Sequence, residues 1–281
     1  MTVEPAVPAV DPARFFNPKA GRPSLVHVRE TGSTSDLAGR LAADGAPEGT
    51  VVVADAQTAG RGRLGRSWSS PAGAGLYVSI VVRPDGSDDQ ALGALLPLAV
   101  GASLAAGLRG LTGTVVELKW PNDLVVRPNA TGVAAAAGGG SGLRKIGGVL
   151  VEAATLGAEV RHAVIGIGIN IGEGAYPAAL ATRAASLMHA GGSAVDRTEL
   201  LDVVLAAVAG AVADLRAGRT NVVLDRVRAM TPSAVGTTVA WELDAHRLAG
   251  VTCGIDADGA LRVASGSRVH RIVSATLDWE V

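Results

Sequence analysis

Short apolar runs alternate along the chain with longer segments in which apolar residues recur at helical spacing. The apolar runs predict β-strands at residues 25–29, 51–54, 76–82, 115–119, 145–153 and 163–171. The helical spacing predicts helices at residues 35–44, 88–110 and 198–217, the last with Thr198 and Glu199 at a capped start. This interleaved order predicts an α+β fold, in which helices pack on one mixed sheet.

The pattern changes after Thr231, where short alternating segments begin. These segments predict strands at residues 238–243, 246–255, 260–263 and 267–273. The turn residues from Asp256 to Gly259 indicate a hairpin between two of them. We therefore expect a small barrel-like C-terminal domain over residues 231–281.

The remaining chain divides into a main domain and two segments of low complexity. Residues 1–23 contain several prolines without a sustained period, and we expect a flexible N-terminal extension there. The main domain then covers residues 24–230. Within it, residues 127–144 are rich in alanine and glycine, which predicts a flexible surface insertion. We favour the interpretation that this insertion has no function over the alternative that it covers a site.

Composition excludes several classes of protein. The 281 residues are 48% hydrophobic and carry a formal charge of -1, so no bulk attraction to DNA or membranes is expected. Residues 91–108 carry no charge, but their small residues, with Pro97 among them, favour a buried helix over a membrane span. The N-terminal segment has no apolar signal core, and a cytoplasmic location is expected. Because Cys253 is the single cysteine, an internal disulfide and a cysteine-rich metal site are excluded.

The segment from Gln57 to Trp68 carries the clearest chemical signal. It places Arg61, Arg63 and Arg66 among glycines, directly after an apolar run. Glycine lets a backbone approach a ligand closely, and arginine offers planar donors that match carboxylate or phosphate oxygens. Taken alone, such a loop could equally be a solvated basic segment or a nucleic-acid patch.

Other segments decide between these alternatives. They read Thr-Gly-Ser-Thr at 31–34, Lys-Trp-Pro-Asn-Asp at 119–123, Lys-Ile-Gly-Gly-Val-Leu-Val-Glu at 145–152 and Gly-Ile-Gly-Ile-Asn at 166–170. In this order the motifs resemble those of the biotin protein ligases (biotin–acetyl-CoA-carboxylase ligases). The resemblance runs from about Leu25 to the C-terminus. It implies that the C-terminal domain is SH3-like.

The resemblance also implies the reaction. Such an enzyme uses ATP to activate biotin as biotinyl-5'-adenylate, and then transfers the biotinyl group to a lysine of a biotin carboxyl carrier domain. Mg²⁺ would arrive with ATP, because no His, Cys and carboxylate cluster has the spacing of a protein-held metal site. Residues 1–23 are too short for the DNA-binding unit of some relatives, so an enzyme without DNA binding is expected. The state is expected to be a monomer or a homodimer.

The alternative reaction is that of a lipoate or octanoate protein ligase of the same fold. Octanoyl transferases need a cysteine nucleophile in the catalytic domain, and Cys253 lies outside that domain. A noncatalytic biotin-binding module is a further alternative. It would have no need of Arg63 and Lys145.

Site residues follow from matching the motifs. Lys145 is the first catalytic candidate, with Arg63 and Arg61 over the carboxylate and the adenylate phosphate. The expected biotin-binding residues are Ser33, Thr34, Ser35, Gln57, Gly60, Arg61, Gly62, Arg63, Lys145 and Gly147. The expected nucleotide-binding residues are Arg63, Arg66, Trp68, Lys119, Asn122, Asp123 and Asn170.

Several of these residues have a second interpretation. Lys145 could be an exposed strand-end lysine, and Ser33 and Thr34 could only cap a helix. Asn170 could only close a turn. Ser35 stands where many members carry asparagine, so its contact is open. Lys119 and Asp123 could form an ion pair beneath the site, whereas core packing is favoured for Trp120. The Arg61–Ser67 loop is expected to be mobile because nothing in the sequence pairs with its charges.

Overall fold

The computed structural model describes residues 10–16, 21–84, 89–127, 142–157, 159–191, 195–243 and 246–280. Most of the expected insertion at 127–144 therefore lies outside the described residues, as does much of the expected extension at 1–23. The described part of that extension is packed rather than loose. Val10 and Phe16 are buried, and a Cβ atom added at Gly49 would lie 2.5 Å from the Phe16 side chain.

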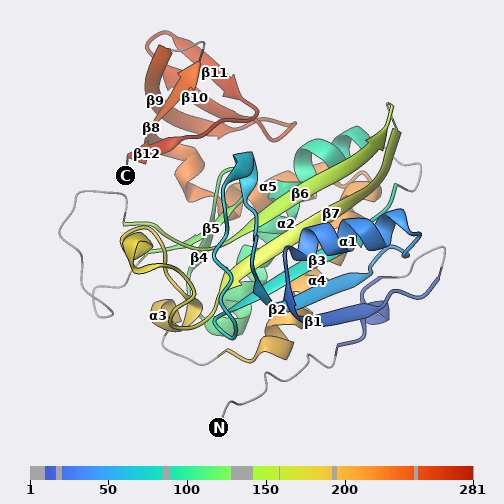
Figure 1. Cartoon of the computed structure of the whole chain (residues 1–281). Helices are drawn as coiled ribbons and strands as arrows, with labels where there is room; N and C mark the ends of the chain where they lie inside the picture. Colours follow the sequence, from blue (N-terminus) through green and yellow to red (C-terminus); the bar gives the residue numbers. More distant parts are fainter. Residues whose placement is uncertain are drawn as a thin grey trace.

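The main domain is built on a seven-stranded sheet in the order β1-β2-β3-β7-β6-β5-β4 (Figure 1). Its strands are β1 (Leu25–Thr31), β2 (Val51–Gln57), β3 (Gly75–Val82), β4 (Val116–Lys119), β5 (Asp123–Val126), β6 (Arg144–Leu156) and β7 (Glu159–Asn170). Strands β1 and β2 are parallel, whereas the other neighbouring pairs are antiparallel. The sheet is therefore mixed, as the sequence predicts.

Alternating side chains cover the two faces of this sheet. Val51 and Val53 belong to the large core cluster, whereas Val52 between them belongs to a smaller cluster on the opposite face. Ile80 and Val81 divide in the same way. The helices are α1 (Thr34–Ala43), α2 (Asp89–Thr112), α3 (Leu187–Gly191), α4 (Arg197–Arg216) and α5 (Thr220–Met230). Helix α1 covers the smaller cluster, and α2, α4 and α5 cover the larger one (Figure 1).

Helix α2 contains the uncharged segment 91–108. By length and composition alone, residues Leu95–Thr112 could cross a membrane, but 56% of that window is buried inside the protein. Leu104 and Leu108 are fully buried in the large core cluster. The segment is thus a core helix, as expected. In α4 the start differs from the prediction, because the cap is Asp196, whose carboxylate accepts hydrogen bonds from Thr198 N and Glu199 N.

A second sheet forms the C-terminal domain, which lies at one side of the main sheet (Figure 1). It has five antiparallel strands in the order β11-β10-β9-β8-β12. They are β8 (Val235–Leu243), β9 (His246–Ile255), β10 (Leu261–Ser265), β11 (Arg268–Ile272) and β12 (Asp278–Glu280). Trp120 Nε1 donates to Gly259 O over 3.0 Å and ties the β9–β10 turn to the main domain. The segment between β11 and β12 returns over the main sheet.

Candidate active site

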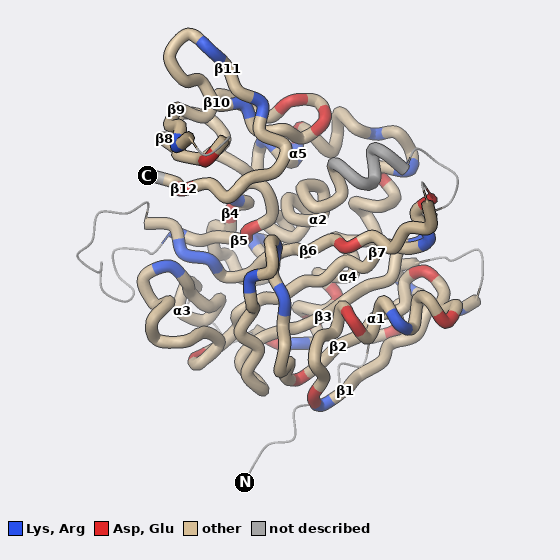
Figure 2. Tube along the Cα trace, turned by 45° about the horizontal axis from the view of Figure 1, so that its top comes forward, with Lys and Arg blue, Asp and Glu red and all other residues tan. Residues whose placement is uncertain are grey.

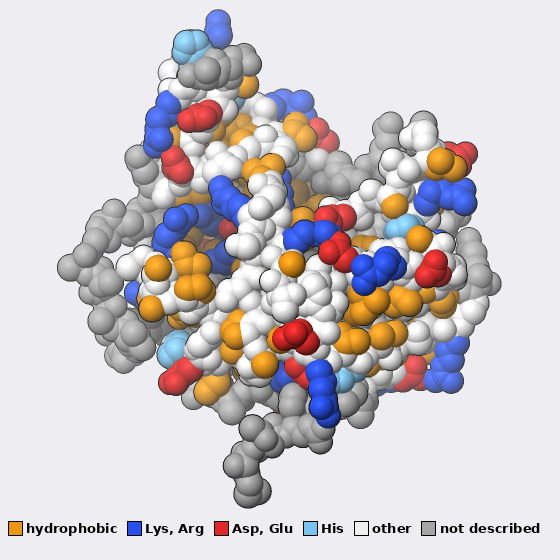
Figure 3. Space-filling view, in the orientation of Figure 1, with side chains coloured by type: hydrophobic (Ala, Val, Ile, Leu, Met, Phe, Trp, Pro, Cys, Tyr) orange, Lys and Arg blue, Asp and Glu red, His pale blue; other side chains and the backbone are white. Residues whose placement is uncertain are grey.

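A cavity of about 250 Å³ lies on the α1 face of the main sheet. Its walls come from segments far apart in the sequence: the β2–β3 loop, the β4–β5 turn, β6, β7, the start of α1 and the segment before β12. Gly148, Gly166 and Gly168 keep its floor free of side chains. Figure 3 shows Lys and Arg side chains gathered beside the β2–β3 loop, below the C-terminal sheet. The cavity therefore has a cationic end.

The β2–β3 loop closes on itself as a short hairpin above the cavity. Gly62 N donates to Arg66 O over 2.7 Å, and Trp68 N donates to Gly60 O over 2.8 Å. Leu64 has a φ of 56°, the left-handed region that non-glycine residues rarely adopt, and it lies 65% exposed at the tip. The tight turn directs the arginines of the loop along its two sides (Figure 2).

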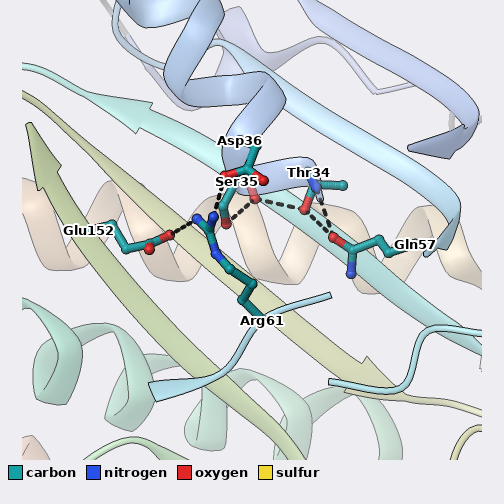
Figure 4. A network of polar contacts seen from close by, with 7 residues as sticks. Thr34, Ser35, Asp36, Gln57, Arg61 and Glu152 are labelled. Atoms are coloured by element: carbon teal, nitrogen blue, oxygen red, sulfur yellow. Dashed lines mark hydrogen bonds and ion pairs between the residues drawn. The ribbon is translucent and has the colours of Figure 1, made fainter. Parts of the chain in front are cut away.

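Arg61 is held by two carboxylates. It pairs with Asp36 of α1 and, over 2.6 Å, with Glu152 of β6 (Figure 4). Burial alone would lower the pKa of Arg61, but the hydrogen bond and charge of Glu152, with Asp36, raise it. The guanidinium is therefore already neutralised. Arg61 lines the cavity and fastens the loop to α1 and β6, and its role over the carboxylate and the adenylate phosphate stays a prediction.

Arg63 and Arg66 contact the C-terminal segment instead. Arg63 donates to Asn122 Oδ1 over 3.3 Å and to Ser274 Oγ over 3.1 Å. Arg66 donates to Thr276 Oγ1 over 3.3 Å. Burial lowers the pKa of Arg63, with Asp123 raising it and Arg66 lowering it further, yet an arginine keeps its charge. All three arginines of the loop thus have partners, and the reason for expecting a mobile loop does not hold.

Lys145 lies in the same cavity as Arg63. Its Nζ is 2.6 Å from Asp123 Oδ1 and 5.3 Å from the centre of the Trp68 ring. A Cβ at Gly148 would come within 3.4 Å of that Nζ, so the glycine leaves the ammonium its space. Its ion pair and its place in the cavity favour a role in the site over that of an exposed strand-end lysine.

Lys119 does not form the predicted ion pair with Asp123. The two residues are opposite each other in the β4–β5 register, but the carboxylate of Asp123 pairs with Lys145. Lys119 Nζ instead lies 5.5 Å from the Trp279 ring centre. Burial lowers the pKa of Lys119, Asp123 raises it, and the nearby cations Lys145, Arg183 and Arg66 lower it. The cations are close enough to repel one another, which favours an anion between them.

The opposite end of the cavity is neutral and polar. Gln57 Oε1 accepts from Thr34 N over 2.8 Å and from Thr34 Oγ1 over 3.0 Å (Figure 4). Ser33, Thr34 and Ser35 are buried and line the cavity. Ser33 is the N-cap of α1, but its side chain makes no capping bond. A capping role alone does not account for this cluster.

Trp68 forms a wall between these ends. Its indole lies directly on β7, because a Cβ at Gly168 would meet Trp68 Nε1 at 2.5 Å. This Nε1 is buried without a hydrogen-bond partner in the part of the chain that the structure describes. Trp68 is thus part of the cavity wall.

Most of the predicted site residues are brought together, but some are not. Gly60, Gly147 and Asn170 do not line the cavity. Asn170 is buried and donates its amide to Ala185 O over 3.0 Å, as expected of a residue that closes a turn. Asn122 lines the cavity, and its amide donates to Val149 O over 2.8 Å, which ties the β4–β5 turn to β6. Trp120 is 2% exposed and packs in the core, which is the interpretation that the sequence analysis favours.

Two contributions to the site were not predicted. Arg183 lines the cavity, because Lys145 N donates to Arg183 O over 2.8 Å and so holds the segment before α3 against β6. The guanidinium of Arg183 has no ion-pair partner within the described ranges. Residues 275–279 form the other unpredicted wall. Apart from Trp279, the residue types in this segment do not predict a place in a binding site. Its role becomes clear only from the fold, which brings the segment to the cavity.

A protein-held metal centre is not found in the described residues, since no group of three His, Cys, Asp or Glu side chains comes together among them. Asp123 is the carboxylate nearest the cationic cluster, and it is paired with Lys145.

Comparison with known proteins relates this site to a family. The family model of the biotin/lipoate A/B protein ligases matches residues 29–170. The biotin–acetyl-CoA-carboxylase ligase of Mycobacterium tuberculosis is 32% identical over 254 residues, which cover 88% of this chain and 85% of that protein. The bifunctional ligase/repressor BirA of Bacillus spizizenii is 30% identical over 257 residues, 90% of this chain and 73% of the relative.

Among solved structures, the chain is similar to the biotin protein ligase from Aquifex aeolicus in complex with biotin and ATP. The TM-score is 0.72 and the sequence identity 27%, with 91% of this chain and 97% of that chain covered. The similarity therefore extends over both sheets.

Proposed function

We infer the function from the premise that the chain belongs to the biotin/lipoate A/B protein ligase family, within which it is a biotin protein ligase. It activates biotin with ATP as biotinyl-5'-adenylate and transfers the biotinyl group to a protein lysine. We propose that the acceptor is a biotin carboxyl carrier domain. The observation that carries the assignment is the shared cavity of Arg63 and Lys145, with a neutral polar end formed by Ser33, Thr34 and Gln57.

The two ends of the cavity match the two ends of biotin. The cyclic urea of biotin needs a few hydrogen-bonding groups in a buried wall, and Thr34, Ser35 and Gln57 supply them. The carboxylate of biotin then extends toward Lys145 and Arg63. A lipoate or octanoate ligase would have no use for the polar end, because those acids carry no hydrogen-bonding group there.

Activation requires two anions to meet. A carboxylate oxygen of biotin attacks the α-phosphorus of ATP, a C–O–P anhydride forms, and the bond to pyrophosphate breaks. Coulomb repulsion between carboxylate and triphosphate opposes this step, and fixed cations lower the barrier by neutralising the charge. Lys145 and Arg63 have this role. Asp123 holds the ammonium of Lys145 in place over 2.6 Å and acts as a positioning residue.

The leaving pyrophosphate needs cations of its own. Arg66, Lys119 and Arg183 line the cavity beyond Lys145, and we propose that they bind the β- and γ-phosphates. Trp68 and Trp279 offer ring faces on the adenylate side. Mg²⁺ bound to the phosphates of ATP would add positive charge at this end of the cavity, and Asp123 would be a carboxylate to hold it.

Transfer then breaks the anhydride. The acceptor lysine amine attacks the carbonyl carbon, and AMP leaves with the electron pair of the C–O bond. Since ATP and carboxylase carriers are cytoplasmic, we propose a cytoplasmic location, with a monomer or homodimer as the working unit.

The direct test is the mass of a biotin carboxyl carrier domain after incubation with the protein, biotin, ATP and Mg²⁺. One biotinyl group on one lysine is the expected product. The same incubation with lipoate or octanoate should give little product. A preference for lipoate would replace the assignment with the alternative ligase, and binding of biotin without any transfer would indicate a binding module.

A further inference from the structure

A continuous chain of hydrogen bonds lies behind the polar end of the cavity. Ser35 Oγ and Ser79 Oγ are 3.1 Å apart, and Ser79 Oγ lies 2.8 Å from Thr34 Oγ1. Thr34 bonds to Gln57 (Figure 4). Gln57 Nε2 in turn donates to Ser70 Oγ over 2.8 Å. Ser79 stands on β3, is fully buried and does not line the cavity, so it cannot touch a ligand there.

The direction of this chain follows from one backbone group. Thr34 N can only donate, so the Gln57 atom 2.8 Å away must be its carbonyl oxygen. That oxygen carries no hydrogen, and the Thr34 hydroxyl 3.0 Å away must therefore donate to it as well. A hydroxyl has one hydrogen. With the hydrogen of Thr34 used, Ser79 must donate to Thr34.

The same argument determines whether the Ser35 hydroxyl donates or accepts. With the hydrogen of Ser79 used for Thr34, Ser35 must donate to Ser79. Ser35 Oγ then has only lone pairs left for the cavity that it lines. A Cβ at Gly166 would come within 2.7 Å of Ser35 Oγ, so the glycine leaves this hydroxyl its space at the cavity wall.

We propose that Ser79 is a positioning residue for substrate selectivity, because it makes Ser35 an obligatory hydrogen-bond acceptor at the polar end of the cavity. The inference rests on the proposed function. An acceptor there selects a ligand that presents an N–H group, as a cyclic urea does. Ligands without such a donor leave the buried oxygen of Ser35 without a partner, which costs binding free energy.

The test compares the binding of biotin with that of its two cyclic carbamate analogues. In each analogue a ring oxygen replaces one N–H group of the urea, so a donor becomes an acceptor with little change in size. Calorimetry gives the Kd of each ligand for the full-length protein. For the analogue altered on the Ser35 side, the wild-type protein should bind biotin about tenfold or more tightly, since two acceptors would then face each other.

Ser79→Ala frees the hydrogen of Ser35, which can then rotate toward the ring oxygen. The preference for biotin over that carbamate should fall to about twofold. Ser70→Ala is the matched control, since Ser70 lies on the other side of Gln57 and does not set the direction toward Ser35. The control should keep the wild-type ratio. An unchanged ratio in Ser79→Ala, or an equal fall in both variants, would overturn the proposal.

A double-mutant cycle shows whether Ser79 acts through Ser35. Ser35→Ala should itself abolish the preference, and the Ser35→Ala/Ser79→Ala protein should then be no worse than Ser35→Ala alone. If the two substitutions lowered the preference for biotin additively, the proposal would be contradicted. It would also be contradicted if Ser35→Ala kept the wild-type preference. The Ser35→Ala variant alone decides the question if Ser79→Ala does not fold. A wild-type protein that binds neither biotin nor the carbamates would instead refute the proposed function.

Discussion

At the scale of single residues, charge compensation explains how so many cations can share one cavity. Lys145 is paired with Asp123, and Arg61 is paired with Asp36 and Glu152. Among the described residues, the hydrogen-bond partners of Arg63 and Arg66 are the neutral side chains of Asn122, Ser274 and Thr276. The positive potential of the site therefore comes mainly from Arg63, Arg66, Lys119 and Arg183, which are the groups left to meet a triphosphate.

Lys145→Ala should impair chemistry more than binding. The ammonium is proposed to meet charge that develops as the anhydride forms, so adenylate formation should fall about 10²- to 10³-fold. The Kd for biotin should change by less than about threefold, because the polar end of the cavity is untouched. Rapid quench of labelled ATP measures the first quantity and calorimetry the second. Normal turnover in the variant would refute the role of Lys145.

The lowered pKa of Lys119 predicts a pH dependence. Burial is the main cause of the lowered pKa. As the pH rises, the ammonium of Lys119 therefore loses its proton at a lower pH than a free lysine does. Affinity for ATP should then weaken as pH rises in the alkaline range. Lys119→Arg keeps its charge throughout and should remove this alkaline limb. The measurement is the KM for ATP between neutral pH and about pH 10. Parallel profiles for both proteins would contradict the assignment.

Arg183 is predicted to bind the phosphates of ATP. Arg183→Gln should raise the KM for ATP about fivefold, since a single charge-assisted contact at a partly solvated site is lost. Arg161→Gln, at the exposed far end of β7, is the matched control and should leave the KM unchanged. Steady-state kinetics at saturating biotin gives both values. Equal effects of the two changes would indicate only a general loss of positive charge.

At the scale of elements, most of the main sheet and its three long helices are predictable because period and length are clear there. The missed elements are short or irregular. Strand β5 (Asp123–Val126) is only four residues long and directly follows a turn. Strand β12 (Asp278–Glu280) has three residues. Local sequence carries too little signal for such elements, and tertiary pairing creates them.

The residues of the site also divide into those that local sequence predicts and those that depend on tertiary structure. Motif residues on regular strands, such as Lys145 and Gln57, line the cavity, and their roles there stay predictions. Partners across the fold are not predictable from local sequence: the carboxylate that pairs with Lys145 depends on the β5–β6 register, and that of Arg61 comes from α1 and β6 together. Arg183 reaches the site only because the segment after β7 folds back on β6.

The ion pairs of Arg61 predict how firmly the β2–β3 loop is held. The Asp36→Asn/Glu152→Gln double variant should speed amide exchange at Gly62 and Trp68 about tenfold, because two partly exposed ion pairs are lost. Asp44→Asn, at the exposed C-terminal end of α1, is the control. Hydrogen exchange followed by mass spectrometry of peptides from the loop tests this. Rapid exchange already present in the wild-type protein would show that the pairs do not hold the loop.

At the scale of the whole molecule, the C-terminal domain takes part in the site. The chain leaves β11, lines the cavity at residues 275–279 and pairs β12 with β8. Arg63 and Arg66 donate to the segment between β11 and β12, and Trp120 is tied to the β9–β10 turn. A second cavity, of about 420 Å³, lies between the domains and shares Arg63 and Asn122 with the first. Residues of both domains therefore line the candidate site.

Substitution of Trp279 measures the contribution of the C-terminal domain to ATP binding. Trp279→Ala removes a wall of the cavity and the ring that lies 5.5 Å from Lys119 Nζ. The KM for ATP should rise about fivefold, and the Kd for biotin should stay within about twofold. Leu243→Ala, an exposed position in β8, serves as the control. A larger effect on biotin than on ATP would place Trp279 on the wrong side of the site.

The central claim is that Arg63 and Lys145 join biotin to ATP at one point before any acceptor is present. Its most direct test is the amount of biotinyl-5'-adenylate formed by the purified protein with biotin, ATP and Mg²⁺ in the absence of a carrier domain. We expect about one adenylate per protein molecule, released together with an equal amount of pyrophosphate. Failure to form the adenylate, or formation of lipoyl adenylate in preference to it, would contradict this account.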